Sequence, residues 1–143
     1  MNDRILVVLQ LALIPLTMLP IPDYWPPIYL IVLFIAGESL LLWVIIYNRF
    51  GNWSIFPKPK TNAKFVSRGP YRIVRHPMYL GLLMVLLSFV LWQPSLLKVA
   101  AFLSLCSVIV VKIGREEQYL SNAFAEWGNY TTNTRYRLVK GVW

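Results

Sequence analysis

Four long apolar stretches constrain the fold of this chain more than any other feature. They cover residues 5–21, 28–47, 78–92 and 96–113 of a chain of 143. A helix needs roughly 17–25 apolar residues to cross the core of a bilayer, so the third stretch is short while the others are long enough. Charged residues make up only 14% of the chain, and a soluble domain this small could not bury so much apolar surface. We therefore expect an all-α integral membrane protein with four transmembrane helices in one domain, residues 1–143.

Proline and charge define the connections between these spans. Four prolines between residues 20 and 27 end the first span and begin the second, because proline is tolerated in a first helical turn but not inside a helix. Gln93-Pro94-Ser95 breaks the last apolar region, so spans three and four form a helical hairpin. The segment 48–77 carries seven basic residues and no acidic one, whereas Asp23 is the one charged residue between the first two spans. The positive-inside rule places the long loop and both termini in the cytoplasm, which predicts a multi-pass membrane protein.

The hairpin brings two polar regions to one end of a helix pair. His76 precedes span three and Glu116 follows span four, so both lie at the predicted cytoplasmic end. Cations, tyrosines and carboxylates beside lipid suit S-adenosylmethionine, since arginine pairs with a carboxylate and tyrosine stacks on adenine or faces a sulfonium. A phosphate-bearing ligand would also suit the basic loop. Structural interpretations remain open, with Arg72 and Arg75 contacting lipid headgroups and Tyr71 and Tyr79 anchoring the interface.

Two further features of charge bear on function. The net charge of +8 lies on a membrane chain, so it indicates topology and contact with anionic membrane lipids, and we expect no nucleic-acid partner. Glu38 lies inside the second span, where a carboxylate is costly unless it is paired or protonated. It either contacts a ligand from the bundle interior or makes an interhelical hydrogen bond, and the neighbouring Gly37 permits close helix approach. We expect no metal site.

A longer motif gives these residues a family context. Gly69-Pro70-Tyr71-Arg72, followed by Arg75-His76-Pro77-Met78-Tyr79 and then by Glu116-Glu117, resembles the isoprenylcysteine carboxyl methyltransferase family, which belongs with the membrane phospholipid methyltransferases. The resemblance covers roughly residues 36 to 143. It extends to Leu120, Phe124, Trp127, Tyr130 and the ending 134–138. The short chain is typical of bacterial members with unassigned acceptors, so the resemblance implies a protein of a bacterial inner membrane.

The resemblance implies a binding site for S-adenosylmethionine built from the elements 63–81 and 112–137, the latter part of a cytoplasmic helical tail. Lys112 falls where the prenylcysteine enzymes use an arginine near the acceptor carboxylate, and lysine keeps the charge but loses the bidentate fork. Lys112 is therefore one candidate catalytic residue. Glu38, inside the second span, is the other, because its carboxylate could assist proton removal from an amine acceptor. The cofactor-binding residues implied are Ala63, Lys64, Phe65, Val66, Tyr71, Arg75, His76, Pro77, Met78, Tyr79, Glu116 and Glu117.

The function that follows is methyl transfer from S-adenosylmethionine to a lipophilic acceptor at the membrane. By analogy we favour carboxyl O-methylation of an isoprenylcysteine-type or other lipid acceptor, and phospholipid N-methylation and thiol S-methylation remain open. A sterol-reductase-like enzyme using NADPH is a further alternative. So is a small multidrug-type transporter with Glu38 as its intramembrane carboxylate, or a lipid-binding or assembly subunit without chemistry.

Overall fold

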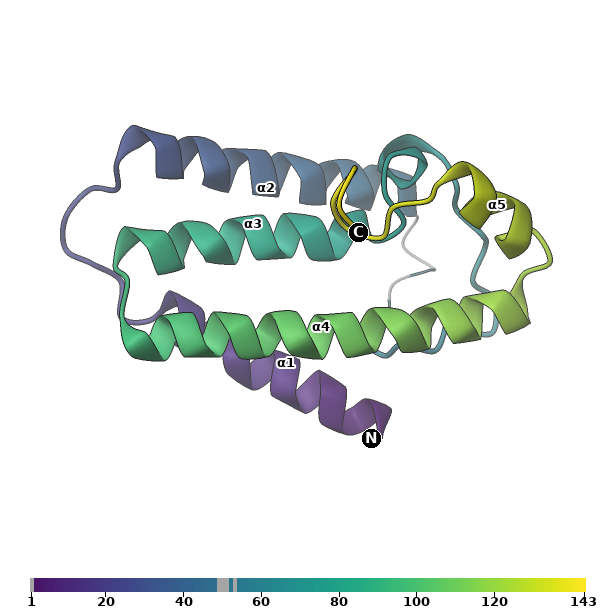
Figure 1. Ribbon diagram of the computed structural model, residues 1–143, viewed down its shortest axis with the longest axis horizontal. Helices are drawn as coiled ribbons and strands as arrows, with labels where there is room; N and C mark the ends of the chain where they lie inside the picture. Colours follow the sequence, from purple (N-terminus) through teal and green to yellow (C-terminus); the bar gives the residue numbers. More distant parts are fainter. Residues whose placement is uncertain (1, 49–51, 53) are drawn as a thin grey trace.

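The computed structural model describes residues 2–48, 52 and 54–143, and Figure 1 shows the helices that they form. Arg49, one of the basic residues of the predicted long loop, lies outside the described residues. No strand occurs in the described part of the chain, which confirms the predicted all-α class. The α-helices are α1 (Asp3–Met18), α2 (Ile28–Asn48), α3 (Pro77–Trp92), α4 (Leu96–Ala123) and α5 (Trp127–Asn133), and a 3-10 helix, η2, covers Gly69–Arg72.

Each predicted span forms a helix, but two of these helices do not end where the predicted span ends. The first helix ends at Met18 rather than at residue 21, where the proline-rich connection begins. The fourth continues to Ala123 rather than ending at residue 113. The apolar run stops near residue 113, but the sequence Arg115-Glu116-Glu117-Gln118 consists of good helix formers, so the helix continues as a polar extension.

Local caps explain where the hairpin turns. The Ser95 side chain accepts a hydrogen bond from the backbone N–H of Lys98, as expected of a helix N-cap. Pro77 occupies the first turn of α3, where its missing N–H costs nothing. The turn between Trp92 and Leu96 therefore reverses the chain, and the predicted hairpin of α3 and α4 is present (Figure 1).

The helices pack in two pairs, α2 against α3 and α1 against α4. Two glycines face each other where α2 meets α3. A Cβ on Gly37 would lie 3.0 Å from the carbonyl oxygen of Gly81, and a Cβ on Gly81 would lie 3.1 Å from that of Gly37. The predicted close approach at Gly37 is thus confirmed. A core cluster joins α3, α4 and the tail through Tyr79, Leu86, Leu105, Ile109, Ile113 and Leu138.

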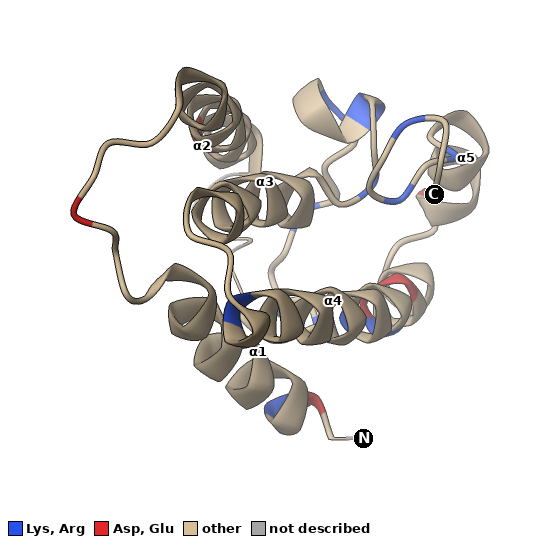
Figure 2. Cartoon of the chain, turned by 60° about the vertical axis from the view of Figure 1, so that its left-hand side comes forward, with Lys and Arg blue, Asp and Glu red and all other residues tan. Residues whose placement is uncertain are grey.

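Two of the described helices are long and apolar enough to cross a membrane, α2 and α4. α3 is apolar but has 16 residues, and α1 has the same length. Length and composition identify α2 and α4 as candidate spans, whereas four spans and the cytoplasmic location of both termini stay predictions. In Figure 1 the α1–α2 and α3–α4 connections lie at one end of the helices, and α5 and the segment before η2 lie toward the other. Figure 2 shows basic positions around η2 and on the tail, away from the acidic position on the α1–α2 connection, and others on α1 and along α4, among them Lys98 in its first turn.

Candidate active site

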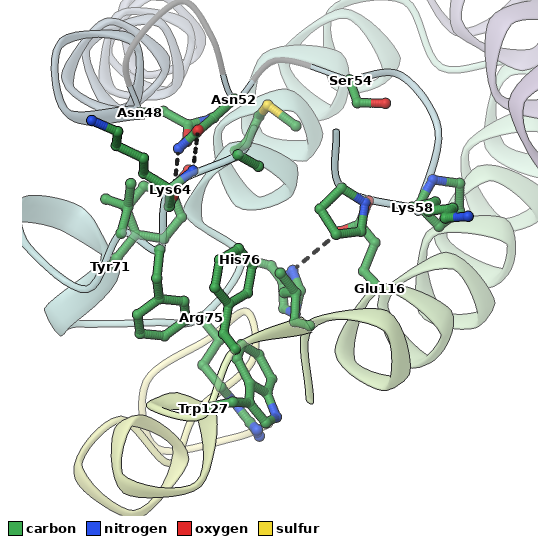
Figure 3. A pocket seen from close by; sticks show the side chains of 18 of the residues that line it. Asn48, Asn52, Ser54, Lys58, Lys64, Tyr71, Arg75, His76, Glu116 and Trp127 are labelled. Carbon is green, nitrogen blue, oxygen red and sulfur yellow. Dashed lines mark hydrogen bonds and ion pairs between the residues drawn. The ribbon is translucent and has the colours of Figure 1, made fainter. Parts of the chain in front are cut away.

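A pocket opens at the end of the helices where α5 lies. It holds about 920 Å³ of empty space, part of which is open to solvent. Its walls come from the end of α2, Asn52, the segment 54–66, the start of α3, the polar extension of α4, and α5 (Figure 3). Segments far apart in the sequence therefore meet at one site, as the predicted hairpin required.

All but one of the predicted cofactor-binding residues line this pocket. Those from the long loop and the start of α3 are Ala63, Lys64, Phe65, Val66, Tyr71, Arg75, His76, Pro77, Met78 and Tyr79, and α4 adds Glu116. The exception is Glu117, which lies behind the pocket wall. The placement agrees with a common site for these residues, and their role in binding stays a prediction.

Glu116 is held at the pocket edge from two sides. It accepts a hydrogen bond from the hydroxyl of Tyr79, and its Oε2 lies 3.5 Å from Nδ1 of His76. His76 and Tyr79 stack on each other with their ring centroids 6.0 Å apart. Figure 3 shows the contact between His76 and Glu116 at the pocket. The Glu116 carboxylate is thus oriented before any ligand binds.

Glu117 does not line the pocket but binds residues that form its wall. Its carboxylate lies 3.2 Å from Arg75 Nη1, 3.3 Å from His76 Nε2 and 2.8 Å from Arg137 Nη2. A buried carboxylate needs such partners, because an unpaired charge away from water is expensive. Glu117 therefore ties the start of α3, the end of α4 and the C-terminal tail together.

Arg75 has one donor that no described residue accepts from. Its Nη1 contacts Glu117 and its Nη2 donates to the carbonyl oxygen of Arg135 at 3.1 Å. Its Nε is buried and has no hydrogen-bond partner within the described residues. Arg75 also lines the pocket. A buried donor without a partner costs free energy unless a ligand or water accepts from it.

An aromatic wall faces this polar edge. The ring of Phe65 lies 5.3 Å from that of Phe124, 6.2 Å from that of Trp127 and 5.3 Å from that of Tyr130. The Tyr130 hydroxyl donates to the carbonyl oxygen of Tyr71 at 2.8 Å, which fixes α5 against η2. Offset and edge-to-face arrangements of this kind are favourable and present flat surfaces to a ligand ring.

The tyrosines near the pocket stay protonated at neutral pH. Burial and the negative charge of Glu116 raise the pKa of Tyr71 well above its ordinary value of 10. Burial likewise raises the pKa of Tyr130, with the tyrosine and carboxylate nearby adding to the effect. Both phenols can donate hydrogen bonds, and neither can act as a base near pH 7.

The segment just after α2 contributes pocket residues that the sequence interpretation missed. Asn52 holds the backbone of Lys64 at two points, with Nδ2 donating to the carbonyl oxygen and Oδ1 accepting from the N–H, both at 2.8 Å (Figure 3). This clamp places residues 63–66 against the pocket. An asparagine among the prolines and lysines of the loop was the one available signal, and it is weak. The missed lining residues are Asn48, Asn52, Ser54, Phe56, Pro57, Lys58 and Pro59.

The two candidate catalytic residues do not line the pocket. Lys112 is buried, and its Nζ donates to Gln10 Oε1 at 2.7 Å and to the carbonyl oxygen of Ile55 at 2.8 Å. Glu38 is exposed on α2, so the expectation that it faces the bundle interior was wrong. The glycine face of α2 packs on α3, and the next residue along the helix, at about 100° from it, points outward.

The structure thus describes a small helical protein with candidate membrane helices and a pocket of carboxylates, cations and aromatic rings. Residues 28–127 match the model of the phospholipid methyltransferase family, which is more than two thirds of the chain, and the chain belongs to this family. The match includes α2, α3, α4 and most of the pocket, whereas α1 and the tail after Trp127 lie outside it. No curated protein matches the chain. Family membership implies a membrane methyltransferase, and members generally use S-adenosylmethionine.

Proposed function

We propose that this protein transfers a methyl group from S-adenosylmethionine to a lipophilic acceptor at the membrane, with carboxyl O-methylation of an isoprenylcysteine-type acceptor as the first candidate reaction. One observation carries the proposal. All but one of the residues that the family resemblance assigns to cofactor binding line one pocket. Glu116 is oriented there by Tyr79, and the Nε of Arg75 has no partner among the described residues.

The chemistry of the pocket suits this cofactor. Glu116 would accept hydrogen bonds from the cofactor's ammonium or ribose hydroxyls, and Arg75 would donate to its carboxylate. The rings of Phe65, Phe124 and Trp127 offer surfaces for the adenine ring. The cofactor, when bound, supplies a methyl group activated by a sulfonium, and the protein contributes binding, orientation and exclusion of water.

The groups around the pocket favour an acceptor that needs no base. Tyr71 stays protonated because burial and Glu116 raise its pKa. Glu116 is already engaged with Tyr79 and His76. A carboxylate acceptor is ionised at neutral pH and can attack the methyl group directly, whereas an amine must first lose a proton. Lys112 gives no support to this choice, because its Nζ is occupied by Gln10 and Ile55.

The family itself makes a phospholipid amine the second candidate acceptor. Thiol methylation has no specific support among the described contacts. The transporter interpretation needs Glu38 inside the bundle, and Glu38 is exposed. Family membership also favours a methyl donor over NADPH. We also propose a topology for the chain. It crosses the membrane four times, and the pocket, the long loop and both termini lie on the cytoplasmic side.

Product chemistry separates the two acceptors. The full chain in lipid nanodiscs would receive S-adenosylmethionine with a labelled methyl group, together with a farnesylated cysteine analogue or phosphatidylethanolamine. A methyl ester releases labelled methanol in alkali, whereas an N-methyl group stays on the lipid. Base-labile label from the prenylcysteine supports the first candidate, and base-stable label on the phospholipid replaces it with the second. No label on either acceptor, by protein that binds the cofactor, contradicts both.

A further inference from the structure

His76 lies between two carboxylates, one facing each nitrogen of its ring. Nδ1 is 3.5 Å from Glu116 Oε2, and Nε2 is 3.3 Å from Glu117 Oε1. The residue is 6% exposed. A neutral imidazole has one N–H and one lone pair, so one of these carboxylates would face a lone pair. A doubly protonated ring donates to both.

The other groups around the ring are accounted for. From α3, the Tyr79 hydroxyl donates to Glu116. Arg75, the residue before His76, and Arg137, from the tail, both pair with Glu117. From α4, the Lys112 Nζ lies 5.5 Å from the centre of the Tyr79 ring. These cations oppose a charge on His76, but the two carboxylates face the ring nitrogens directly.

The balance of these effects raises the pKa of His76. Burial alone lowers it, because a charged ring loses its hydration. Hydrogen bonds to Glu116 and Glu117, together with their negative charges, outweigh burial and bring the pKa above the ordinary value of 6.5.

We propose that His76 is an imidazolium in the working protein, where it acts as a positioning residue that fixes Glu116 at the pocket and Glu117 at the tail. It does not accept a proton from the methyl acceptor, since neither ring nitrogen has a free lone pair. The structural part of this inference stands on the contacts of the ring alone. The statement about the acceptor rests on the proposed function.

The protonation of His76 determines the pH range in which the site is intact. A group whose pKa is raised on folding contributes its stabilisation fully below the pKa of the unfolded chain and loses it as the pH rises through the folded pKa. For His76 the contribution is therefore complete below about 6.5 and is lost above the raised value. Folding stability and cofactor affinity should both decline as the pH rises through the raised pKa of His76.

The chain offers an unusually direct test, because His76 is its single histidine. The full chain, labelled with nitrogen-15 at histidine and held in nanodiscs without cofactor, would be titrated from about pH 6 to 10 by long-range proton–nitrogen NMR. The ring-nitrogen shifts distinguish imidazolium from either neutral tautomer. We expect a midpoint above 6.5, with both ring nitrogens protonated on its acid side. A midpoint at or below 6.5 in folded wild-type protein overturns the proposal.

Two variants and a second readout complete the test. Glu117→Gln removes one of the two carboxylates and should lower the midpoint, while Glu126→Gln, an exposed position at the start of α5, should leave it unchanged. An unchanged midpoint in folded Glu117→Gln contradicts the assigned cause. Cofactor affinity measured over the same pH range should fall through the same midpoint. Because the titration needs no cofactor, failure to bind S-adenosylmethionine would contradict the proposed function and leave the protonation of His76 intact.

Discussion

Arg137 donates from Nε and from Nη2 to the same oxygen of Glu117, at 2.9 Å and 2.8 Å. The backbone adds to this link, because the N–H of His76 donates to the carbonyl oxygen of Arg137 at 2.8 Å. The C-terminal tail therefore holds the start of α3 and the end of α4 in one arrangement. The pocket depends on a segment that lies outside the region matched by the family model.

Arg137→Lys tests this link. Lysine keeps the charge but cannot donate from two nitrogens to one carboxylate oxygen. We expect a loss of about 1 kcal/mol in unfolding free energy, less than the roughly 1.5–3 kcal/mol typical of a hydrogen bond to a charged group, because the site is partly exposed. Affinity for S-adenosylmethionine should fall with it. Thermal unfolding and calorimetry would measure both, with Arg135→Lys as the matched control. Equal effects of the two substitutions would contradict the role of Arg137.

Asn52→Asp tests the clamp on Lys64. The new carboxylate keeps the acceptor for the N–H of Lys64 but places an oxygen against its carbonyl oxygen, where Nδ2 now donates. If the misplaced residues 63–66 cost about 1.4 kcal/mol of binding free energy, cofactor affinity would fall about tenfold. The unfolding temperature should change little, because the clamp is exposed. Calorimetry on Asn52→Asp and on the exposed control Asn62→Asp would measure this. A cofactor affinity equal to wild type would show that residues 63–66 need no clamp.

Lys112→Met separates a structural role from a role at the acceptor. The substitution leaves Gln10 Oε1 and the carbonyl oxygen of Ile55 without their donor. Each such loss costs about 1–3 kcal/mol, so the unfolding temperature should drop clearly, whereas Lys140→Met at an exposed position should change nothing. A raised KM for the acceptor with unchanged stability would instead show that Lys112 contacts the substrate.

Glu38→Gln should leave both cofactor affinity and methyl transfer unchanged. Glu38 is exposed on α2 and is absent from the lining of the pocket. A loss of activity of about tenfold or more, which corresponds to at least 1.4 kcal/mol in the barrier, would restore it as a catalytic residue. Labelled methyl transfer in nanodiscs is the measurement.

Most of the fold could be predicted from apolar runs and prolines. The four apolar stretches correspond to α1, α2, α3 and α4, and the break at Gln93-Pro94-Ser95 forms the hairpin turn. The predicted helix ends were less accurate. The apolar run ends near residue 113, but the polar residues that follow have good helix propensity, so α4 continues to Ala123. Which face of a helix packs inward was harder still. α2 is apolar nearly all round, so its sequence alone could not show that Gly37 faces α3 while Glu38 points outward.

The site could be predicted as far as the motif extends. Tyr71, residues 75–79 and Glu116 line one pocket because the hairpin brings the start of α3 and the polar extension of α4 together. The adjacent Glu117 points to the other side of the wall, where Arg75 and Arg137 pair with it. Adjacent residues on a helix differ by about 100° in direction. Two adjacent glutamates therefore should not be assigned the same role from the sequence alone. Asn52 and the segment 54–59 show no regular sequence pattern, and their place at the pocket depends on long-range contacts such as those of Asn52 and Lys112.

The central claim is that this pocket binds S-adenosylmethionine, and calorimetry on the purified full chain in nanodiscs tests it most directly. We predict saturable binding that Glu116→Gln weakens at least tenfold, since the substitution removes the charge that the ammonium or ribose hydroxyls would meet. Glu126→Gln, an exposed carboxylate outside the pocket, should bind as wild type does. Absence of binding to folded wild-type protein, or equal binding by Glu116→Gln, would contradict the account.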